Sequence, residues 1–140
     1  MAQQRVSPAL PGWVQVVTWL GALLMAAGGA IALVHPQMLV SPADQINGAV
    51  RIYAGYLASR NFAVAAALLL TLLLRARGAL GVLMMLTALI QIADAAIDCF
   101  EGRWSIVPGV TVLGLLFFLA AARVSGYPFW SAAAWRAKGQ

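Results

Sequence analysis

Polar side chains interrupt a strongly apolar part of this sequence in and just before LIQIADAAIDCFEGRW, residues 89–104. Successive polar positions are separated by four, three and four residues, which places them on one face of a helix. They are Thr87, Gln91, Asp94 and Asp98. Two neighbouring carboxyl groups can divide the roles of general acid and general base, so Asp94 and Asp98 are candidate catalytic residues.

A second polar group occupies GAVRIYAGYLASRN, residues 48–61. Tyr53, Tyr56 and Arg60 are spaced by three and four residues and therefore share a helix face. A tyrosine hydroxyl can donate a hydrogen bond to negative charge developing on a substrate oxygen, so Tyr56 and Arg60 join the predicted catalytic group. The predicted substrate-binding residues are Arg51, Tyr53, Asn61 and Gln91.

The composition of the chain indicates an integral membrane protein. Of 140 residues, 63% are hydrophobic and 9% are charged, whereas about 25% are charged in a typical soluble domain. Four apolar segments are each close to the roughly 20 residues that a helix needs to cross a bilayer. They cover residues 13–34, 48–74, 78–100 and 106–124. Because strand-like alternation is absent, we predict an all-α fold, an antiparallel bundle of four transmembrane helices in a single membrane domain, residues 1–140.

The first apolar segment and the residues after the fourth one carry additional sequence signals. The first apolar segment has features of a signal peptide, since Arg5 precedes it and AAGGA follows at 26–30. The apolar run continues through Val34, however, so we interpret it as a retained helix. Pro128 should stop the fourth helix, and the aromatic and basic residues of 125–140 predict a short interfacial tail helix.

Basic residues predict the orientation of the bundle. An even number of spans puts both termini and the 75–77 turn on one side, where six basic and no acidic residues gather. Those six are Arg5, Arg75, Arg77, Arg123, Arg136 and Lys138. Cytoplasmic loops carry an excess of positive charge, so both termini should face the cytoplasm. The expected location is the inner membrane of a bacterial cell.

The antiparallel arrangement should bring the two polar groups together. Side chains lean toward the N-terminus of their helix, so Arg60 and Asp94, on helices of opposite direction, lean toward each other. We predict an ion pair or hydrogen-bonded network of Arg60, Asp94 and at least one tyrosine, in a pocket that opens to the non-cytoplasmic side. The alternative is a purely structural ion pair that joins two helices.

Arg51 lies about half a turn out of phase with Arg60. It begins a ridge of small residues at every fourth position, which is typical of close helix packing in membranes. The ridge continues through Gly55, Ser59, Ala63 and Ala67. We therefore expect Arg51 to turn into a helix interface near the outer rim, with either Asp98 or Asp44 as its partner.

Charge and cysteine usage limit the classes of partner. The net charge of +5 comes from basic residues at predicted helix ends, which indicates contact with the lipid bilayer and its anionic headgroups rather than with nucleic acid. Cys99 and His35 are the only cysteine and the only histidine, so no metal site, bound cofactor or internal disulfide is expected. The single cysteine still allows a disulfide between two copies of the chain, and therefore a homo-oligomer.

The run RIYAGYLASRNFAVAAALLL, followed by QIADAAIDC, resembles the DoxX-like superfamily of small four-helix membrane proteins. The resemblance covers mainly residues 48–100, and within the superfamily the chain is most similar to an uncharacterised group of small integral membrane proteins. Its motif consists of Arg51, Arg60, Asp94 and Asp98. The resemblance implies a left-handed four-helix bundle, and some relatives are subunits of quinone-linked redox complexes. Dithiol chemistry is not expected, because the chain has no pair of cysteines.

These features favour an intramembrane acid-base enzyme that acts on a small lipophilic substrate. A hydrolase, isomerase or cyclase needs no metal, and epoxide opening is one example of such chemistry. The alternative is a non-catalytic subunit of a membrane complex that binds a quinone or lipid. A proton-coupled exporter ranks last, because the acidic residues lie near one face of the membrane and the first helix has none.

Overall fold

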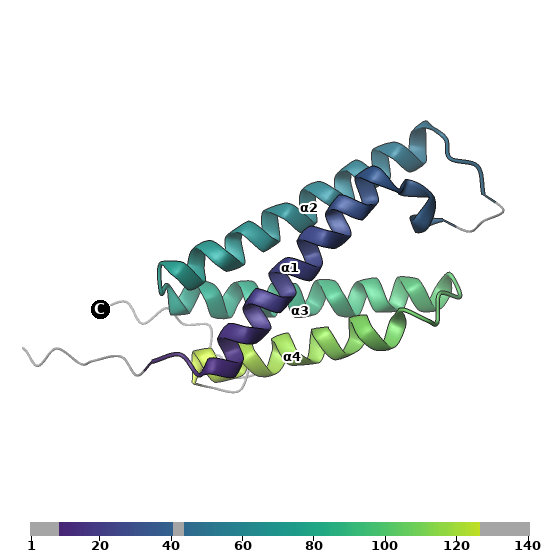
Figure 1. The fold of residues 1–140 in the computed structure, drawn as a ribbon. Helices are drawn as coiled ribbons and strands as arrows, with labels where there is room; N and C mark the ends of the chain where they lie inside the picture. The colour runs from purple at the N-terminus through teal and green to yellow at the C-terminus, as the bar shows by residue number, and fades with distance from the viewer. Residues whose placement is uncertain (1–8, 41–43, 127–140) are drawn as a thin grey trace, which may run out of the picture.

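The computed structural model describes residues 9–40 and 44–126, and this part of the chain contains helices and no strand. Four long helices and one short 3-10 helix follow one another along the chain (Figure 1). They are α1 (Gly12–Val34), η1 (Pro36–Leu39), α2 (Gly48–Leu73), α3 (Arg77–Phe100) and α4 (Val107–Ser125). All four long helices are apolar enough and long enough to cross a membrane, which confirms the predicted all-α fold and indicates a multi-pass membrane protein.

Local signals fix the helix ends close to their predicted positions. The Asn47 side chain caps α2 by accepting a hydrogen bond from the backbone N–H of Val50, at 3.1 Å. Pro108 lies in the first turn of α4, where its missing N–H leaves no hydrogen bond unmade. Arg75 adopts a left-handed backbone conformation, φ 55°, in the tight turn between α2 and α3. The tail predicted at 125–140 lies outside the described residues beyond Gly126.

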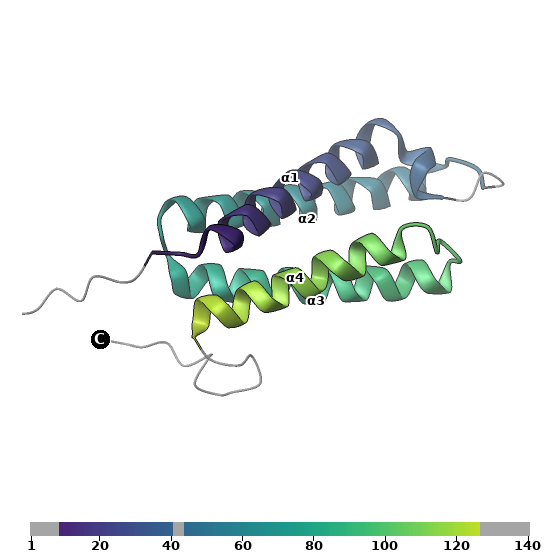
Figure 2. The same cartoon turned by 60° about the horizontal axis from the view of Figure 1, so that its bottom comes forward.

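The helices form two hairpins that lie one above the other. The closest pairs are α1 with α2 and α3 with α4, and Figure 2 shows these pairs as two layers. Contacts between the layers are less extensive, from α2 to α3 and from α1 to α4. In Figure 1, α1 crosses the bundle obliquely, from beside the end of α4 to beside the start of α2. The two hairpins therefore diverge toward the end that carries the α1–α2 and α3–α4 connections.

The apolar core follows the same division. One large cluster draws side chains from all four long helices, with Val14, Leu68, Met84 and Phe117 almost completely buried. A small separate cluster, Ala32, Ala54 and Ala58, joins only α1 to α2. No four-helix apolar core therefore fills the diverging half, and that half holds the polar residues predicted to form a site.

Gly21 permits the closest approach between the layers. A Cβ atom at this position would overlap the Phe117 ring, which is completely buried. We therefore expect Gly21→Ala to lower the free energy of unfolding by about 1–2 kcal/mol, because the ring must shift within a packed core. Titration of the protein from mild detergent into SDS measures this loss. Gly55→Ala is the matched control, because its Cβ would meet nothing within 4 Å; equal stability of the two variants would contradict the packing described here.

Candidate functional site

An ion pair between Arg60 and Asp94 joins the two layers at the point where they begin to diverge. The Nη1 of Arg60 donates to Oδ1 of Asp94 at 3.2 Å, and Nη2 donates to Oδ2 at 2.9 Å. The side chains are 37% and 30% exposed. Two parallel hydrogen bonds fix the plane of the carboxylate as well as its position. The predicted pairing of these residues across antiparallel helices is therefore confirmed.

The helix geometry explains why these two residues meet. Arg60 lies about 22 Å along α2 from the turn at Arg75, whereas Asp94 lies about 28 Å along α3. Arginine is long, and its side chain leans toward the N-terminus of α2, away from the turn. Asp94 leans in the opposite direction along α3, so the two side chains close the difference of about 6 Å.

The polar face of α3 points into the protein, as the spacing predicted. Thr87 is completely buried, and Gln91 and Asp98 are 9% and 8% exposed. The hydroxyl of Thr87 donates to the Leu83 carbonyl at 2.8 Å within its own helix, so it serves the helix rather than a site. Gln91 lies against α4, where a Cβ on Gly114 would come within 3.3 Å of the Gln91 Cβ.

Asp94 lines a cleft of about 480 Å³ between the two layers. The other polar lining residues are Asn61, Gln91 and Ser105. The apolar lining comes from α1 and from the beginning of α4 and the residue before it, through Leu24, Met25, Ile106, Val110 and Leu113. The cleft thus has a polar floor on α2 and α3 and an apolar wall on α1 and α4. Sequence reasoning missed Ser105 and the apolar wall, because both depend on how the two hairpins meet.

Asp98 belongs to a different ion pair. Its Oδ1 lies 3.4 Å from Nη1 of Arg103, and it does not line the cleft. The backbone N–H of Arg103 donates to the Asp98 carbonyl at 2.8 Å, and that of Gly102 donates to the Cys99 carbonyl at 3.2 Å. With Gly102 at φ 69°, this is a Schellman ending of α3, which folds Arg103 back over Asp98. The glycine just beyond the helix is the sequence signal that could have predicted this pair.

Of the two partners expected for Arg51, Asp98 is therefore wrong, whereas the pairing with Asp44 stays a prediction. Arg51 is exposed, and Asp98 is paired with Arg103. The ridge that begins at Arg51 is not a helix interface within the described chain, since Ser59 and Ala63 are exposed and a Cβ on Gly55 would meet open space. The small residues that pack α2 on α1 lie on a neighbouring ridge. They are Ala54 and Ala58, and the backbone of Ala58 approaches Gly29.

The expected participation of a tyrosine in the ion-pair network is also wrong. Tyr53 and Tyr56 are 58% and 73% exposed, and neither hydroxyl bonds to Arg60 or Asp94. The three residues do share a face of α2, but that face borders the exposed surface of the helix. The long flexible arginine turns from its edge into the protein, whereas the rigid tyrosine rings stay outside. The Nε of Arg60 is buried and has no hydrogen-bond partner among the described residues.

No protein-family profile, curated protein or solved structure matches this chain.

The polar groups that line the cleft keep hydrogen-bonding capacity that a ligand could use. Each carboxylate oxygen of Asp94 accepts one hydrogen bond from Arg60, and each has a further lone pair. Asn61 and Gln91 supply amide groups that both donate and accept, and Ser105 supplies a hydroxyl. In the described part of the chain, no three His, Cys, Asp or Glu side chains are placed to hold a metal ion. The arrangement can accept a proton at Asp94 and stabilise an oxygen atom through amide N–H groups.

The two ion pairs should differ in strength. The Asp98–Arg103 atoms are 3.4 Å apart, the arginine is 39% exposed, and the residues are neighbours in one helix ending. We expect a coupling free energy of about 1 kcal/mol or less from a double-mutant cycle of Asp98→Asn and Arg103→Gln, measured by SDS unfolding. The corresponding cycle on Arg60 and Asp94 should give a larger coupling. A reversed order would mean that the inter-helix pair does not hold the layers together.

Proposed function

We propose that this chain binds a small lipophilic molecule in the cleft and acts on it as an intramembrane acid-base enzyme, with Asp94 as the general base. One observation carries the proposal: a carboxylate held in two hydrogen bonds by Arg60 borders a cleft with a polar floor and an apolar wall. An apolar wall suits the hydrocarbon part of a ligand, and a few convergent polar groups suit its reacting end.

Among hydrolase, isomerase and cyclase reactions, the geometry favours isomerisation. Hydrolysis of an epoxide requires an acid for the leaving oxygen, yet Asp98 lies outside the cleft and the tyrosines lie on the outer face of α2. An isomerase can use one carboxylate to remove a proton and to return it elsewhere. The sequence candidates Tyr56, Tyr53 and Arg51 then have no direct role in this reaction.

The proposed step is a proton shift next to a carbonyl group. Asp94 removes a proton from the carbon beside the substrate carbonyl, and the electron pair of the C–H bond moves onto the carbonyl oxygen. Amide N–H groups of Asn61 and Gln91 stabilise the resulting enolate. In a β,γ-unsaturated ketone this enolate is conjugated with the C=C bond. The electron pair therefore returns through that bond to form a C–H bond at the γ-carbon with the proton from Asp94, and the C=C bond moves to the α,β position. Arg60 acts as a positioning residue that keeps the carboxylate fixed throughout.

The second candidate is a non-catalytic subunit that binds a lipid or quinone. The observation that favours it is the same ion pair, because a pair that joins α2 to α3 could serve structure alone. In that case the cleft would bind a ligand whose protons do not exchange. We also propose that the chain belongs to the DoxX-like superfamily, and such membership is compatible with both candidates.

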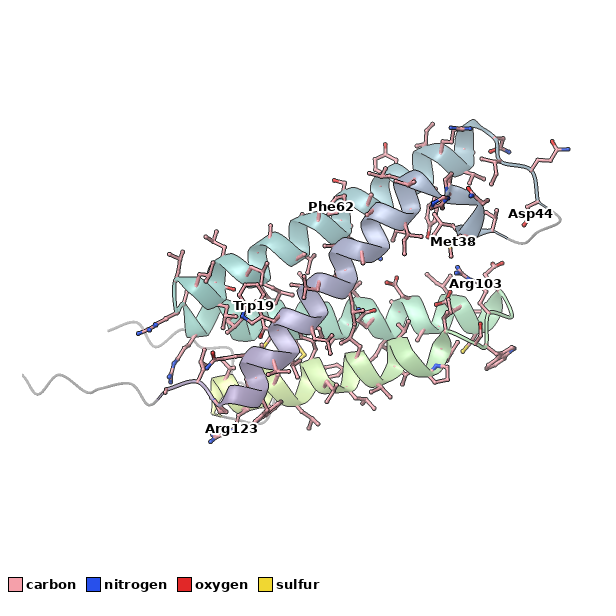
Figure 3. All side chains as sticks on the ribbon, in the orientation of Figure 1. Trp19, Met38, Asp44, Phe62, Arg103 and Arg123 are labelled. Atoms are coloured by element: carbon pink, nitrogen blue, oxygen red, sulfur yellow. The ribbon has the colours of Figure 1, made fainter. Side chains whose placement is uncertain are left out.

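We also propose that the cleft faces the non-cytoplasmic side of a bacterial inner membrane, with both termini in the cytoplasm. Arg75, Arg77 and Arg123 lie at one end of the bundle, and Arg103 lies at the other, on the end of the α3–α4 hairpin opposite Met38 (Figure 3). The sequence carries further basic residues near both termini, outside the described residues. The positive-inside rule supports this orientation.

Deuterium exchange tests the proposed function without knowledge of the natural substrate. The purified chain, in nanodiscs of neutral lipid and in D2O, is incubated with a series of lipophilic β,γ-unsaturated ketones. Mass spectrometry should detect incorporation of deuterium into the ketone faster than in nanodiscs without protein. Ketones that bind but do not exchange would support the non-catalytic subunit and contradict the enzyme.

A further inference from the structure

The cleft reaches exposed residues on α1 and α4, two helices that are long and apolar enough to cross a membrane. Leu24 on α1 and Gly109 on α4 both line the cleft, and both are exposed. Nearer the core, Phe117 of α4 packs against Gly21 of α1. On the opposite side of the bundle, Arg60 and Asp94 join α2 to α3. A molecule can therefore reach the polar floor from the bilayer by passing between α1 and α4.

The charges around the floor select against an ionic ligand. The carboxylate of Asp94 is the only formally charged group among the described lining residues, and its charge is balanced by the adjacent Arg60. Asn61, Gln91 and Ser105 are uncharged, so the floor offers hydrogen bonds without an unpaired charge. A charged end group would also have to pass the apolar opening, where an unpaired charge is strongly disfavoured.

We infer that the ligand is an uncharged lipophilic molecule that reaches the cleft laterally from the bilayer, between α1 and α4. This inference rests on the proposed function and specifies the class of substrate and its route. The hydrocarbon chain of the ligand lies along Leu24, Val110 and Leu113, and its polar end meets Asp94 and the two amides.

Photolabelling with three matched probes tests the class of ligand. The probes share one diazirine-bearing alkyl chain and end in a methyl ketone, a quaternary ammonium or a sulfonate. The full chain in neutral nanodiscs is labelled, and mass spectrometry gives the ratio of label on residues 106–113 to label on the exposed face of α2. That face, which includes Ile52 and Leu70, reports the concentration of each probe in the bilayer. The ketone ratio should exceed both ionic ratios at least about tenfold.

Two variants that obstruct the opening test the route. Gly109→Leu adds a side chain where a Cβ would meet nothing within 4 Å, and Gly55→Leu is its control on the outer face of α2. Leu24→Trp narrows the opening from α1, and its control is Leu23→Trp, at a residue that is exposed but does not line the cleft. We expect both obstructing variants to reduce ketone labelling of residues 106–113 at least about fivefold, because the added side chain hinders entry of the ketone into the cleft. Both controls should label as the wild type does.

The outcomes separate this inference from the proposed function. An ionic probe that labels the cleft as strongly as the ketone would overturn the class of ligand. Obstructing variants that label like their controls would overturn the lateral route. If no probe labels residues 106–113 above the outer face of α2, the cleft does not bind lipophilic molecules and the proposed function fails as well.

Discussion

Asp94→Asn should lower the rate of deuterium exchange into a bound ketone at least about a hundredfold, because the amide cannot accept the proton as a general base. The substitution keeps the shape of the side chain and leaves one oxygen to accept a hydrogen bond from Arg60. The fold should therefore persist, with a thermal midpoint that falls less than in Arg60→Gln, because the Arg60 guanidinium keeps one hydrogen bond to the oxygen of the introduced amide. Exchange by mass spectrometry and unfolding by circular dichroism, on the same nanodisc preparation, separate the two effects.

Asp98→Asn and Tyr56→Phe are the matched controls for this prediction. Asp98 is on the same helix face as Asp94 but is paired with Arg103 outside the cleft, and the Tyr56 ring is exposed on the outer face of α2. Both variants should exchange at the wild-type rate. A loss in Asp98→Asn equal to that in Asp94→Asn would show that the cleft does not distinguish the two carboxylates, and the assignment of the base would be wrong.

Arg60→Gln should lower the free energy of unfolding by about 2–3 kcal/mol. The variant leaves the Asp94 carboxylate without its cationic partner at the junction of the two layers, in largely apolar surroundings. SDS titration in mixed micelles measures the change. Exchange should fall as well, because the carboxylate loses the two hydrogen bonds that fix its plane.

A second variant distinguishes loss of the pair from loss of one partner. Arg60→Met combined with Asp94→Leu replaces both charged groups with apolar side chains, which removes the unpaired carboxylate. This double variant should be more stable than Arg60→Gln alone, although it cannot catalyse exchange. If it is equally unstable, the cost of Arg60→Gln arises from packing of the arginine side chain and not from the stranded charge.

Much of the fold could be predicted from the sequence because it depends on local properties. Four apolar segments of sufficient length require helices in a bilayer, and the tight turn at Arg75 makes α2 and α3 antiparallel. The lean of side chains along two antiparallel helices then predicted the Arg60–Asp94 pair. None of these inferences required knowledge of how the two hairpins meet.

The remaining features of the site depend on the angle between the hairpins. Helical periodicity placed Tyr53 and Tyr56 on the same face as Arg60, but it cannot indicate that only a long flexible side chain reaches inward from that face. The oblique course of α1, which creates the apolar wall of the cleft, has no signature in the composition of the helix. Helical periodicity could not predict that Arg103 pairs with Asp98, because Arg103 lies in the loop after the end of α3.

Solid-state NMR on the labelled chain in nanodiscs tests the central proposal that a carboxylate joined to Arg60 faces a ligand site. A correlation between the Arg60 Nη atoms and the Asp94 carboxyl carbon should be present, and the methyl ketone probe should shift the Asp94 carboxyl resonance while leaving that of Asp98 in place. Absence of the correlation, or a shift confined to Asp98, would contradict the account.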